Sequence, residues 1–154
     1  LAVSARDFQS VSDMAHELAL FHKEDLTPDP VKLLTDSNWF SASIVSVQNL
    51  DVGFCAWYKI YACQSASRIY ELQSLYVLLP YRGLQIATRM VRELAKLALA
   101  DQAVIGIGVR KENLMALAFY KKIGCTVLDR NDIWHCRWGA REMQKFIEST
   151  CHLA

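Results

Sequence analysis

The apolar residues change their spacing along the chain, and the clearest change lies between residues 74 and 88. Leu75–Leu79 is a short run of large apolar and β-favouring residues, which predicts a strand. Pro80 ends that strand because it has no N–H for the ladder, and Gly83 permits a tight turn. From Ile86 the apolar residues recur at helical spacing, so this stretch predicts a strand, a short basic turn and a helix.

The first forty residues predict mainly helix. Residues 2–5 are expected to form a short strand, and Asp7 is expected to cap a helix that continues to about His22. The segment HKEDLTPDP then breaks the helix, and a short helix is expected over Val31–Thr35. The acidic residues of this segment fit either a solvated turn or a rim that attracts a cationic amine.

Four strand-like segments occupy the middle of the chain. Ser41–Val47 and Asp51–Ala62 are separated by a short polar turn and predict a hairpin. Ile69–Leu78 is the next strand. Ala103–Val109 is a short apolar strand that contains two glycines, which often mark the close approach of a ligand or of another backbone.

The last third of the chain predicts a helix from Asn113 that stops at Gly124, a hairpin of Cys125–Leu128 with Ile133–Trp138, and an amphipathic terminal helix. Three strands in series followed by strand–helix–strand predict a mixed sheet, antiparallel first and parallel later. The expected fold class is therefore mixed α/β (α+β), with a central sheet flanked by helices. Residues 1–154 are expected to form a single domain.

Composition and charge exclude several classes of protein. The chain has 154 residues, of which 53% are apolar and 21% charged, and its net charge is +1. This balance is ordinary for a globular protein and gives no case for binding nucleic acid or an anionic membrane. There is no long apolar run and no secretion signal, so we expect a cytoplasmic protein. Five cysteines without a CxxC pair predict buried or half-buried free thiols and no metal site.

The predicted strand–turn–helix around Gly83 has a chemical meaning. It points several backbone N–H groups and a helix N-terminus at one place, which suits a phosphate or pyrophosphate, and Arg82 adds a positive charge there. A solvated turn is the ordinary alternative, because many αβ proteins have a glycine between a strand and a helix. A second stretch, NLMALAFYKKIGC at residues 113–125, favours the anion-binding reading.

Together the two stretches resemble the acetyl-coenzyme A-binding motifs of the GNAT family of N-acetyltransferases. That family shows a strand, then Arg/Gln-x-x-Gly-x-Gly/Ala and a helix. Further on it shows Asn, a small residue three positions later, and an aromatic-Tyr-Lys-x-x-Gly ending. The matching residues here are Arg82, Ala87, Asn113, Ala116, Phe119, Tyr120, Lys121 and Gly124. Gln85 departs from the pattern, because the family usually has glycine there. Its side chain would either crowd a phosphate or point outward while its N–H still serves.

The resemblance implies a role for each matching position. Acetyl-coenzyme A would be the co-substrate, with its pyrophosphate wrapped by backbone N–H groups and its pantetheine arm paired with the main chain of the preceding strand. Tyr120 would be the general acid that gives a proton to the departing thiolate. The expected cofactor-binding residues are Tyr76, Val77, Leu78, Arg82, Gly83, Leu84, Gln85, Ile86, Ala87, Thr88, Asn113, Ala116 and Phe119.

The acceptor is less defined. The overall layout is most similar to the diamine (spermidine/spermine) and thialysine acetyltransferase branch, whose acidic pair falls here on Gln73 and Ser74. Neither residue is an acid, which argues against the usual polyamine contacts of that branch. The expected acceptor is a primary amine: a polyamine-like or other small amine, an amino acid, or a protein N-terminus or lysine. Glu71 lies two residues before Gln73, on the same face of the strand, and is a candidate general base. A surface glutamate is the simpler alternative for Glu71, and a core tyrosine is the simpler alternative for Tyr120.

Two readings compete for the whole chain. The first is an acetyl-coenzyme A-dependent N-acetyltransferase that acts on a primary amine by direct attack in a ternary complex. The second is a catalytically weak acetyl-coenzyme A-binding protein or a dimeric interaction protein on the same fold. A homodimer is expected by analogy with the family, and Trp134 and Trp138 near the C-terminus are candidates for its interface.

Overall fold

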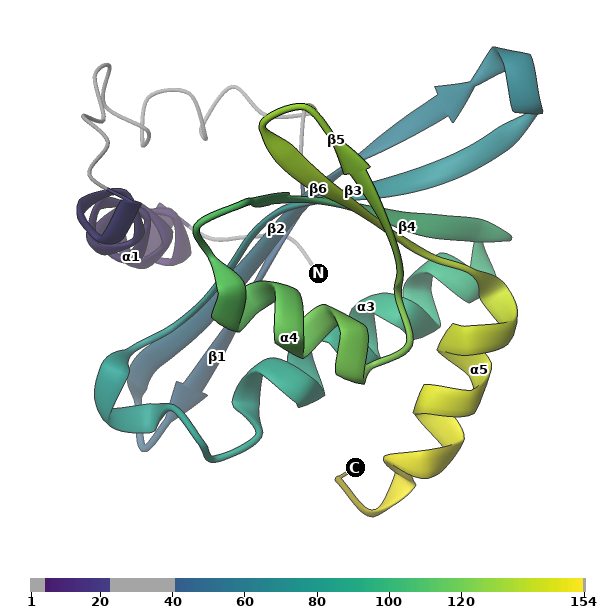
Figure 1. Ribbon diagram of the computed structural model, residues 1–154. Coiled ribbons are helices and arrows are strands. Elements are labelled where there is room, and N and C mark those ends of the chain that lie inside the picture. The colour runs from purple at the N-terminus through teal and green to yellow at the C-terminus, as the bar shows by residue number, and fades with distance from the viewer. Residues whose placement is uncertain (1–4, 23–40, 154) are drawn as a thin grey trace. The chain divides into compact units, whose positions relative to one another are not determined.

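The structure is a computed structural model that describes residues 5–22 and 41–153. The elements in chain order are α1 (Ala5–His22), β1 (Ser41–Val47), β2 (Leu50–Ala62), β3 (Ser67–Val77), α3 (Ile86–Ala100), β4 (Ala103–Arg110), α4 (Leu114–Lys122), β5 (Thr126–Arg130), β6 (Ile133–Trp138) and α5 (Ala140–Ser149) (Figure 1). The helix expected over Val31–Thr35 lies outside the described residues. No helix in the described ranges is long and apolar enough to span a membrane.

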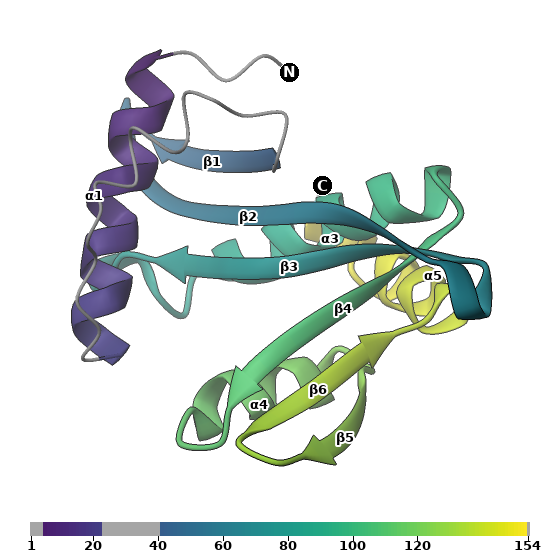
Figure 2. The same ribbon diagram turned by 90° about the horizontal axis from the view of Figure 1, so that it is seen from above.

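The strands form a six-stranded sheet with the order β1-β2-β3-β4-β6-β5. β3 and β4 are parallel and pair Arg68–Leu72 with Ala103–Ile107. β6 is antiparallel both to β4 and to β5 (Figure 2). The predicted fold class, a mixed sheet flanked by helices, is therefore confirmed.

The chain divides into two compact units. The first unit holds the residues up to Ala56 together with Ser74–Met90, and the second holds Trp57–Gln73 and the residues from Val91 onward. The prediction of a single domain remains a prediction, and each unit is described by itself below.

In the first unit, helix α1 packs on one face of β2 and β3. Val11 and Met14 of α1 form a buried cluster with Phe54, Ala56 and Tyr76. Side chains of a strand alternate between the two faces of the sheet, so the neighbours of Phe54, Ala56 and Tyr76 along their strands lie on the face away from α1. Helix α1 begins at Ala5, so the expected helix cap at Asp7 is wrong. Of the strand expected over residues 2–5, residue 5 is helical and residues 2–4 lie outside the described residues.

The opposite face of the first unit depends on Gly53. A Cβ atom at this position would lie 2.8 Å from the Tyr76 carbonyl oxygen and 3.5 Å from the Met90 sulfur. Real Cβ atoms do not approach a carbonyl so closely, so only glycine fits between β2, β3 and the first turns of α3. The sheet of this unit therefore lies between α1 and the start of α3.

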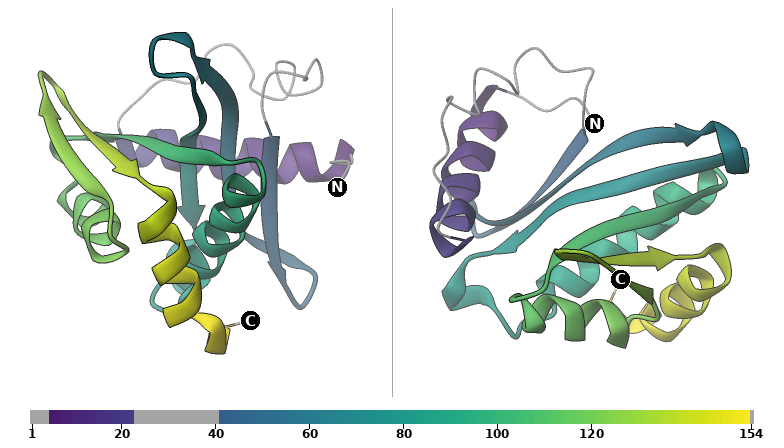
Figure 3. Two further views of the ribbon diagram at one scale, coloured as in Figure 1. Left: turned by 90° about the vertical axis from the view of Figure 1, so that its right-hand side faces the viewer. Right: turned by 45° about the horizontal axis from the view of Figure 1, so that its top comes forward.

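In the second unit, α4 and α5 cover one face of β4, β5 and β6 (Figure 3). Ile105, Ile107 and Val109 of β4 are buried at alternate positions, which is the period expected of a strand with one covered face. The rings of Trp138 and Phe146 meet edge to face with centroids 5.1 Å apart. Trp138 is only 1% exposed, so the expectation that it helps to form a dimer interface is wrong.

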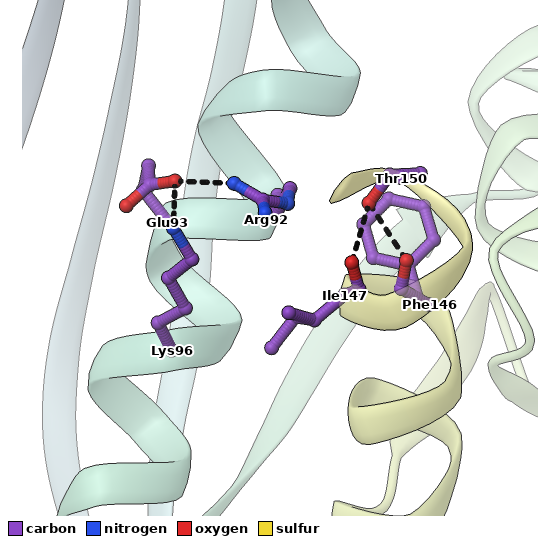
Figure 4. A network of polar contacts seen from close by, with 6 residues as sticks. All are labelled: Arg92, Glu93, Lys96, Phe146, Ile147 and Thr150. Carbon is purple, nitrogen blue, oxygen red and sulfur yellow. Dashed lines mark hydrogen bonds and ion pairs between the residues drawn. The ribbon is translucent and has the colours of Figure 1, made fainter. Parts of the chain in front are cut away.

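Polar contacts on the helices of the second unit are mostly local (Figure 4). Glu93 accepts hydrogen bonds from its neighbours Arg92, at 3.1 Å, and Lys96, at 2.7 Å. At the end of α5 the Thr150 hydroxyl donates to the Phe146 carbonyl at 2.7 Å. These bonds satisfy the end of α5 and the charged groups of α3, of which Arg92 is buried, and involve none of the predicted site residues.

Positive φ angles account for several turns. The two residues between β1 and β2, Gln48 and Asn49, have φ values of 51° and 66°, which suits the tight hairpin predicted there. Gly124 has a φ of 96° and follows α4. Its N–H donates to the Lys121 carbonyl, and the next N–H donates to the Tyr120 carbonyl, so the predicted glycine stop is confirmed as a Schellman motif.

The five cysteines are free thiols. Cys55, Cys125 and Cys136 are buried, whereas Cys63 and Cys151 are exposed, which corrects the expectation that all would be at least half-buried. Burial raises the pKa of the Cys55 and Cys125 thiols to about 12, so both are protonated at neutral pH.

Candidate functional site

The strand–turn–helix predicted around Gly83 is present in the first unit. β3 ends at Val77, and the N–H of Leu78 still donates to the Val52 carbonyl of β2 at 2.9 Å. A single 3₁₀ turn with Pro80 follows, and α3 begins at Ile86. The turn is therefore fixed at one end by the strand pairing and at the other by the helix.

Arg82 is held against the end of the strand. Its Nε donates to the Val77 carbonyl at 2.9 Å, and its guanidinium carbon lies 5.5 Å from the centre of the Tyr76 ring. The Tyr76 hydroxyl in turn donates to the Glu17 carboxylate of α1 at 2.7 Å. Burial, and next this hydrogen bond, raise the pKa of Tyr76, so the phenol stays protonated at neutral pH. The arginine charge is thus fixed beside the turn by contacts with strand and ring.

The backbone after Arg82 presents a row of N–H groups. Among the described residues, none accepts a hydrogen bond from the N–H groups of residues 83–88. Three of these six N–H groups belong to the first turn of α3, where a helix leaves its donors without internal partners. Residues 83–85 are exposed, so the first half of this row lies at the surface. Such a row at a helix N-terminus can bind an anion with several oxygens.

Gln85 takes the backbone conformation that glycine ordinarily supplies. Its φ is 61°, and that of Gly83 is 81°. The Gln85 carbonyl accepts a hydrogen bond from the Arg89 N–H at 3.0 Å, so the residue caps the helix. Its side chain is exposed. Of the two alternatives weighed for this position, an outward side chain with an available N–H is the one that the backbone favours.

The second predicted stretch lies in the second unit. Asn113 is the N-cap of α4, and its side-chain oxygen accepts from the Ala116 N–H at 3.0 Å. Tyr120 lies two turns along the helix, is 6% exposed, and meets Phe119 edge to face with centroids 5.3 Å apart. Asn113, Ala116 and Phe119 are half-buried. The predicted residues of this stretch therefore share one short, well-capped helix.

Glu71 lies in a small pocket of the second unit, on the face of the sheet opposite to α4 and α5. The pocket has a volume of about 40 Å³ and is lined by residues of β3, β4, β5 and β6: Glu71, Gly106, Ile107, Leu128, Arg130, His135, Cys136 and Arg137. Glu71 is half-buried. Burial raises the pKa of its carboxyl group above the ordinary value, while the charges of Arg137 and His135 lower it by less.

The pocket exists because β4 has a glycine at its floor. Glu71 pairs with Gly106 across β3 and β4, and Gly106 pairs with Arg137 across β4 and β6. Neighbouring strands are about 4.8 Å apart, so Glu71 and Arg137 flank a position without a side chain. A Cβ atom on Gly106 would overlap the Glu71 carboxylate. The glycine therefore makes room for the carboxylate, which explains one of the two glycines noted in this strand.

Sequence reasoning missed the basic residues of the pocket. Arg130, His135 and Arg137 lie on the terminal hairpin, far from Glu71 along the chain. The spacing of His135 and Arg137 by two residues on a strand was the available signal, because such residues share a face. No cluster of His, Cys, Asp and Glu able to hold a metal ion occurs in residues 5–22 or 41–153.

Comparison with known proteins identifies the class. The sequence profile described as "Acetyltransferase (GNAT) family" matches residues 12–125. The chain therefore belongs to the GNAT family of acetyltransferases, as the motifs around Gly83 and Asn113 predicted. Members of this family take their acetyl group from acetyl-coenzyme A, in agreement with the predicted co-substrate.

One curated relative is the thialysine N-epsilon-acetyltransferase of Bos taurus, which is 30% identical over 86 residues. The match covers 55% of this chain and 50% of the relative, so the chain spans about half the length of the curated relative it matches. The predicted branch is thus supported only by this partial likeness.

Solved structures agree with the fold. Naa50 of Arabidopsis thaliana, in complex with the bisubstrate analogue CoA-Ac-MVNAL, has a TM-score of 0.66 at 17% identity and covers 89% of this chain and 94% of its own. The paia N-acetyltransferase of Thermoplasma acidophilum, in complex with coenzyme A, has a TM-score of 0.68 at 16% identity, with 88% and 94% covered. The ribosomal-protein-alanine N-acetyltransferase of Brucella melitensis reaches 0.70 at 20% identity, with 83% and 90% covered.

Proposed function

We propose that the protein is an acetyl-coenzyme A-dependent N-acetyltransferase that transfers the acetyl group directly to a primary amine in a ternary complex. The observation that carries the proposal is the row of N–H groups over residues 83–88, which have no acceptor among the described residues and follow a fixed arginine. Membership of the GNAT family supports the same conclusion.

The pyrophosphate would bind to this row. A diphosphate offers several oxygen acceptors, and main-chain N–H groups from Gly83, Leu84, Gln85, Ile86, Ala87 and Thr88 supply the donors. Arg82 would add its fixed positive charge beside the diphosphate. The positive φ of Gln85 supports this role, because it orients that N–H as a glycine would.

The rest of the donor would be held by main chain and by one helix. In the proposal the backbone of Tyr76, Val77 and Leu78 pairs with the pantetheine amides, and an N–H of this strand stabilises the oxyanion that forms at the thioester. Residues near the start and middle of α4 would line the cofactor: Asn113, Ala116 and Phe119.

The chemistry then needs one acid and one base. The amine nitrogen attacks the thioester carbon, the C–S bond breaks, and the thiolate takes a proton from the Tyr120 hydroxyl. A phenol with an ordinary pKa of about 10 carries this proton at neutral pH. Glu71 would take the proton that the amine loses. Its raised pKa makes it a stronger base than an ordinary glutamate.

Two assays test the proposal. Calorimetric titration with acetyl-coenzyme A measures binding, and thiol release across a panel of amines measures transfer. We expect micromolar binding and release with at least one amine. Binding without turnover for every amine would favour the rival reading of a cofactor-binding or interaction protein.

The role of Tyr120 has its own test. Tyr120→Phe removes the hydroxyl and keeps the ring, so we expect kcat to fall about 100-fold or more with little change in the KM for acetyl-coenzyme A. Tyr61→Phe is the matched control, because Tyr61 is 60% exposed on β2. A core tyrosine without a chemical role would change Tm and leave kcat unaltered.

The remaining expectations are proposals of the same kind. The acceptor is a small amine, a polyamine-like amine or an amino acid, and the protein is a cytoplasmic homodimer. The bovine relative is named for an amino-acid acceptor, which supports the last of these acceptor classes. Light scattering would report the oligomeric state, and a monomer at all concentrations would remove the dimer.

A further inference from the structure

The pocket around Glu71 carries more positive than negative charge. Its lining contains one carboxylate, two guanidinium groups and an imidazole. No hydrogen bond or ion pair within the described residues joins Glu71 to Arg130, His135 or Arg137. Donors and acceptor therefore remain available to a bound molecule.

We infer that this pocket selects an acceptor that carries a carboxylate close to its ammonium group, that is, a free amino acid rather than a diamine. The inference rests on the proposed function and specifies its acceptor. Glu71 receives the ammonium, while Arg137 and His135 receive the carboxylate. A diamine would satisfy Glu71 but place a second positive charge against the guanidinium groups of Arg130 and Arg137.

The geometry agrees with this division. Glu71 and Arg137 lie on either side of Gly106, separated by the width of two strand spacings, about 10 Å between their backbones. Both side chains line the same small pocket, so a carboxylate and a guanidinium group border one space. An α-amino carboxylate, whose charged groups are three bonds apart, fits a site with opposite charges so placed. A cavity of about 40 Å³ has room for a group of carboxylate size.

The test compares substrates that differ only at the carboxylate. L-lysine, L-lysinamide and cadaverine share one carbon chain and carry respectively an acid, a neutral amide and no such group. Initial rates of thiol release at saturating acetyl-coenzyme A give kcat and KM for each. We expect L-lysine to exceed both analogues in kcat/KM by about tenfold or more, mainly through KM.

Variants then assign the preference to the pocket. Arg137→Gln should raise the KM for L-lysine about tenfold and leave that for cadaverine unchanged or lower, and Arg137→Lys should retain part of the preference because the charge stays. Arg141→Gln is the matched control, because Arg141 is an exposed arginine of α5 outside the pocket. In this variant the ratio of the KM values for L-lysine and cadaverine should equal that of the unaltered protein.

Each outcome decides something. Turnover of cadaverine or L-lysinamide at least equal to that of L-lysine overturns the inference and leaves the proposed acetyltransferase intact. A preference for L-lysine that survives Arg137→Gln also overturns it, since the carboxylate would be recognised elsewhere. Absence of thiol release with every amine removes the proposed function and the inference together.

Discussion

Replacement of Gln85 by glycine should stabilise the protein. Gln85 has a φ of 61°, a conformation that costs a residue with a Cβ atom about 1–2 kcal/mol. Glycine removes this cost but loses about 0.5–1 kcal/mol through its greater freedom in the unfolded chain. The difference is a gain of up to about 1.5 kcal/mol with a middle value of about 0.75 kcal/mol, which for a chain of this size raises Tm by about 2–3 °C.

The assay is thermal unfolding by circular dichroism, with two controls. Gln102→Gly repeats the change at another exposed glutamine with a φ of 54° and should give a similar rise. Gln85→Ala removes the side chain but keeps the Cβ atom, so its Tm should not rise. A lower Tm for Gln85→Gly, or an equal rise for Gln85→Ala, would refute the argument from backbone conformation.

The variant Gln85→Gly also tests the proposed binding of the pyrophosphate by residues 83–88. If the Gln85 N–H is already oriented for an anion, the Kd for acetyl-coenzyme A should change by less than about threefold in Gln85→Gly. A much larger gain in affinity would mean that the glutamine side chain obstructs the pyrophosphate, which is the alternative that the exposed side chain disfavours.

Three further predictions concern the pocket. Gly106→Ala should displace the Glu71 carboxylate and lower kcat/KM about tenfold, at a cost of less than about 1.5 kcal/mol in stability. Gly108→Ala is the control and should leave kcat/KM unaltered, because a Cβ atom there would meet Ile133 of the described residues at an ordinary 3.6 Å. Equal activity of the two variants would contradict the role of Gly106. Burial raises the pKa of Glu71, so kcat/KM should fall as the pH drops through a value above about 4.3, and Glu71→Gln should abolish that part of the profile. Because the pKa of Glu71 is higher in the folded than in the unfolded chain, the protonated carboxyl group favours folding. This contribution to stability is fully present below the unfolded pKa and is lost as the pH rises through the folded pKa. At pH 7, Glu71→Gln should therefore be at least as stable as the unaltered protein when measured by urea unfolding.

The fold could be predicted from the sequence because its signals are local. The change of period at Ile86 places α3 at its observed start, and the polar pair between β1 and β2 forms the expected turn. Gly124 follows α4 with a positive φ of 96°, which a glycine adopts readily, so the predicted helix end was found from residue type. The start of α1 could not be found in this way, since Asp7 is a good cap by type and the helix nevertheless begins at Ala5.

The site was predictable only in part. The turn after Arg82 follows from local sequence, and the resemblance to a family motif marks Tyr120. The pocket at Glu71 depends on which strands are neighbours, because the order β3-β4-β6 brings residue 71 beside residue 106 and residue 106 beside residue 137. That order is a property of the sheet and is not contained in the spacing of residues along any one strand.

Two contacts connect helix α1 to the turn after Arg82: the hydrogen bond from Tyr76 to Glu17, and the contact of the Arg82 guanidinium with the Tyr76 ring. In the proposed function, a change at Glu17 would therefore affect the cofactor-binding turn, although α1 is far from that turn along the chain. Substitutions in α1 can therefore change how rigidly the Arg82 guanidinium is held while the residues of the family motif stay unchanged.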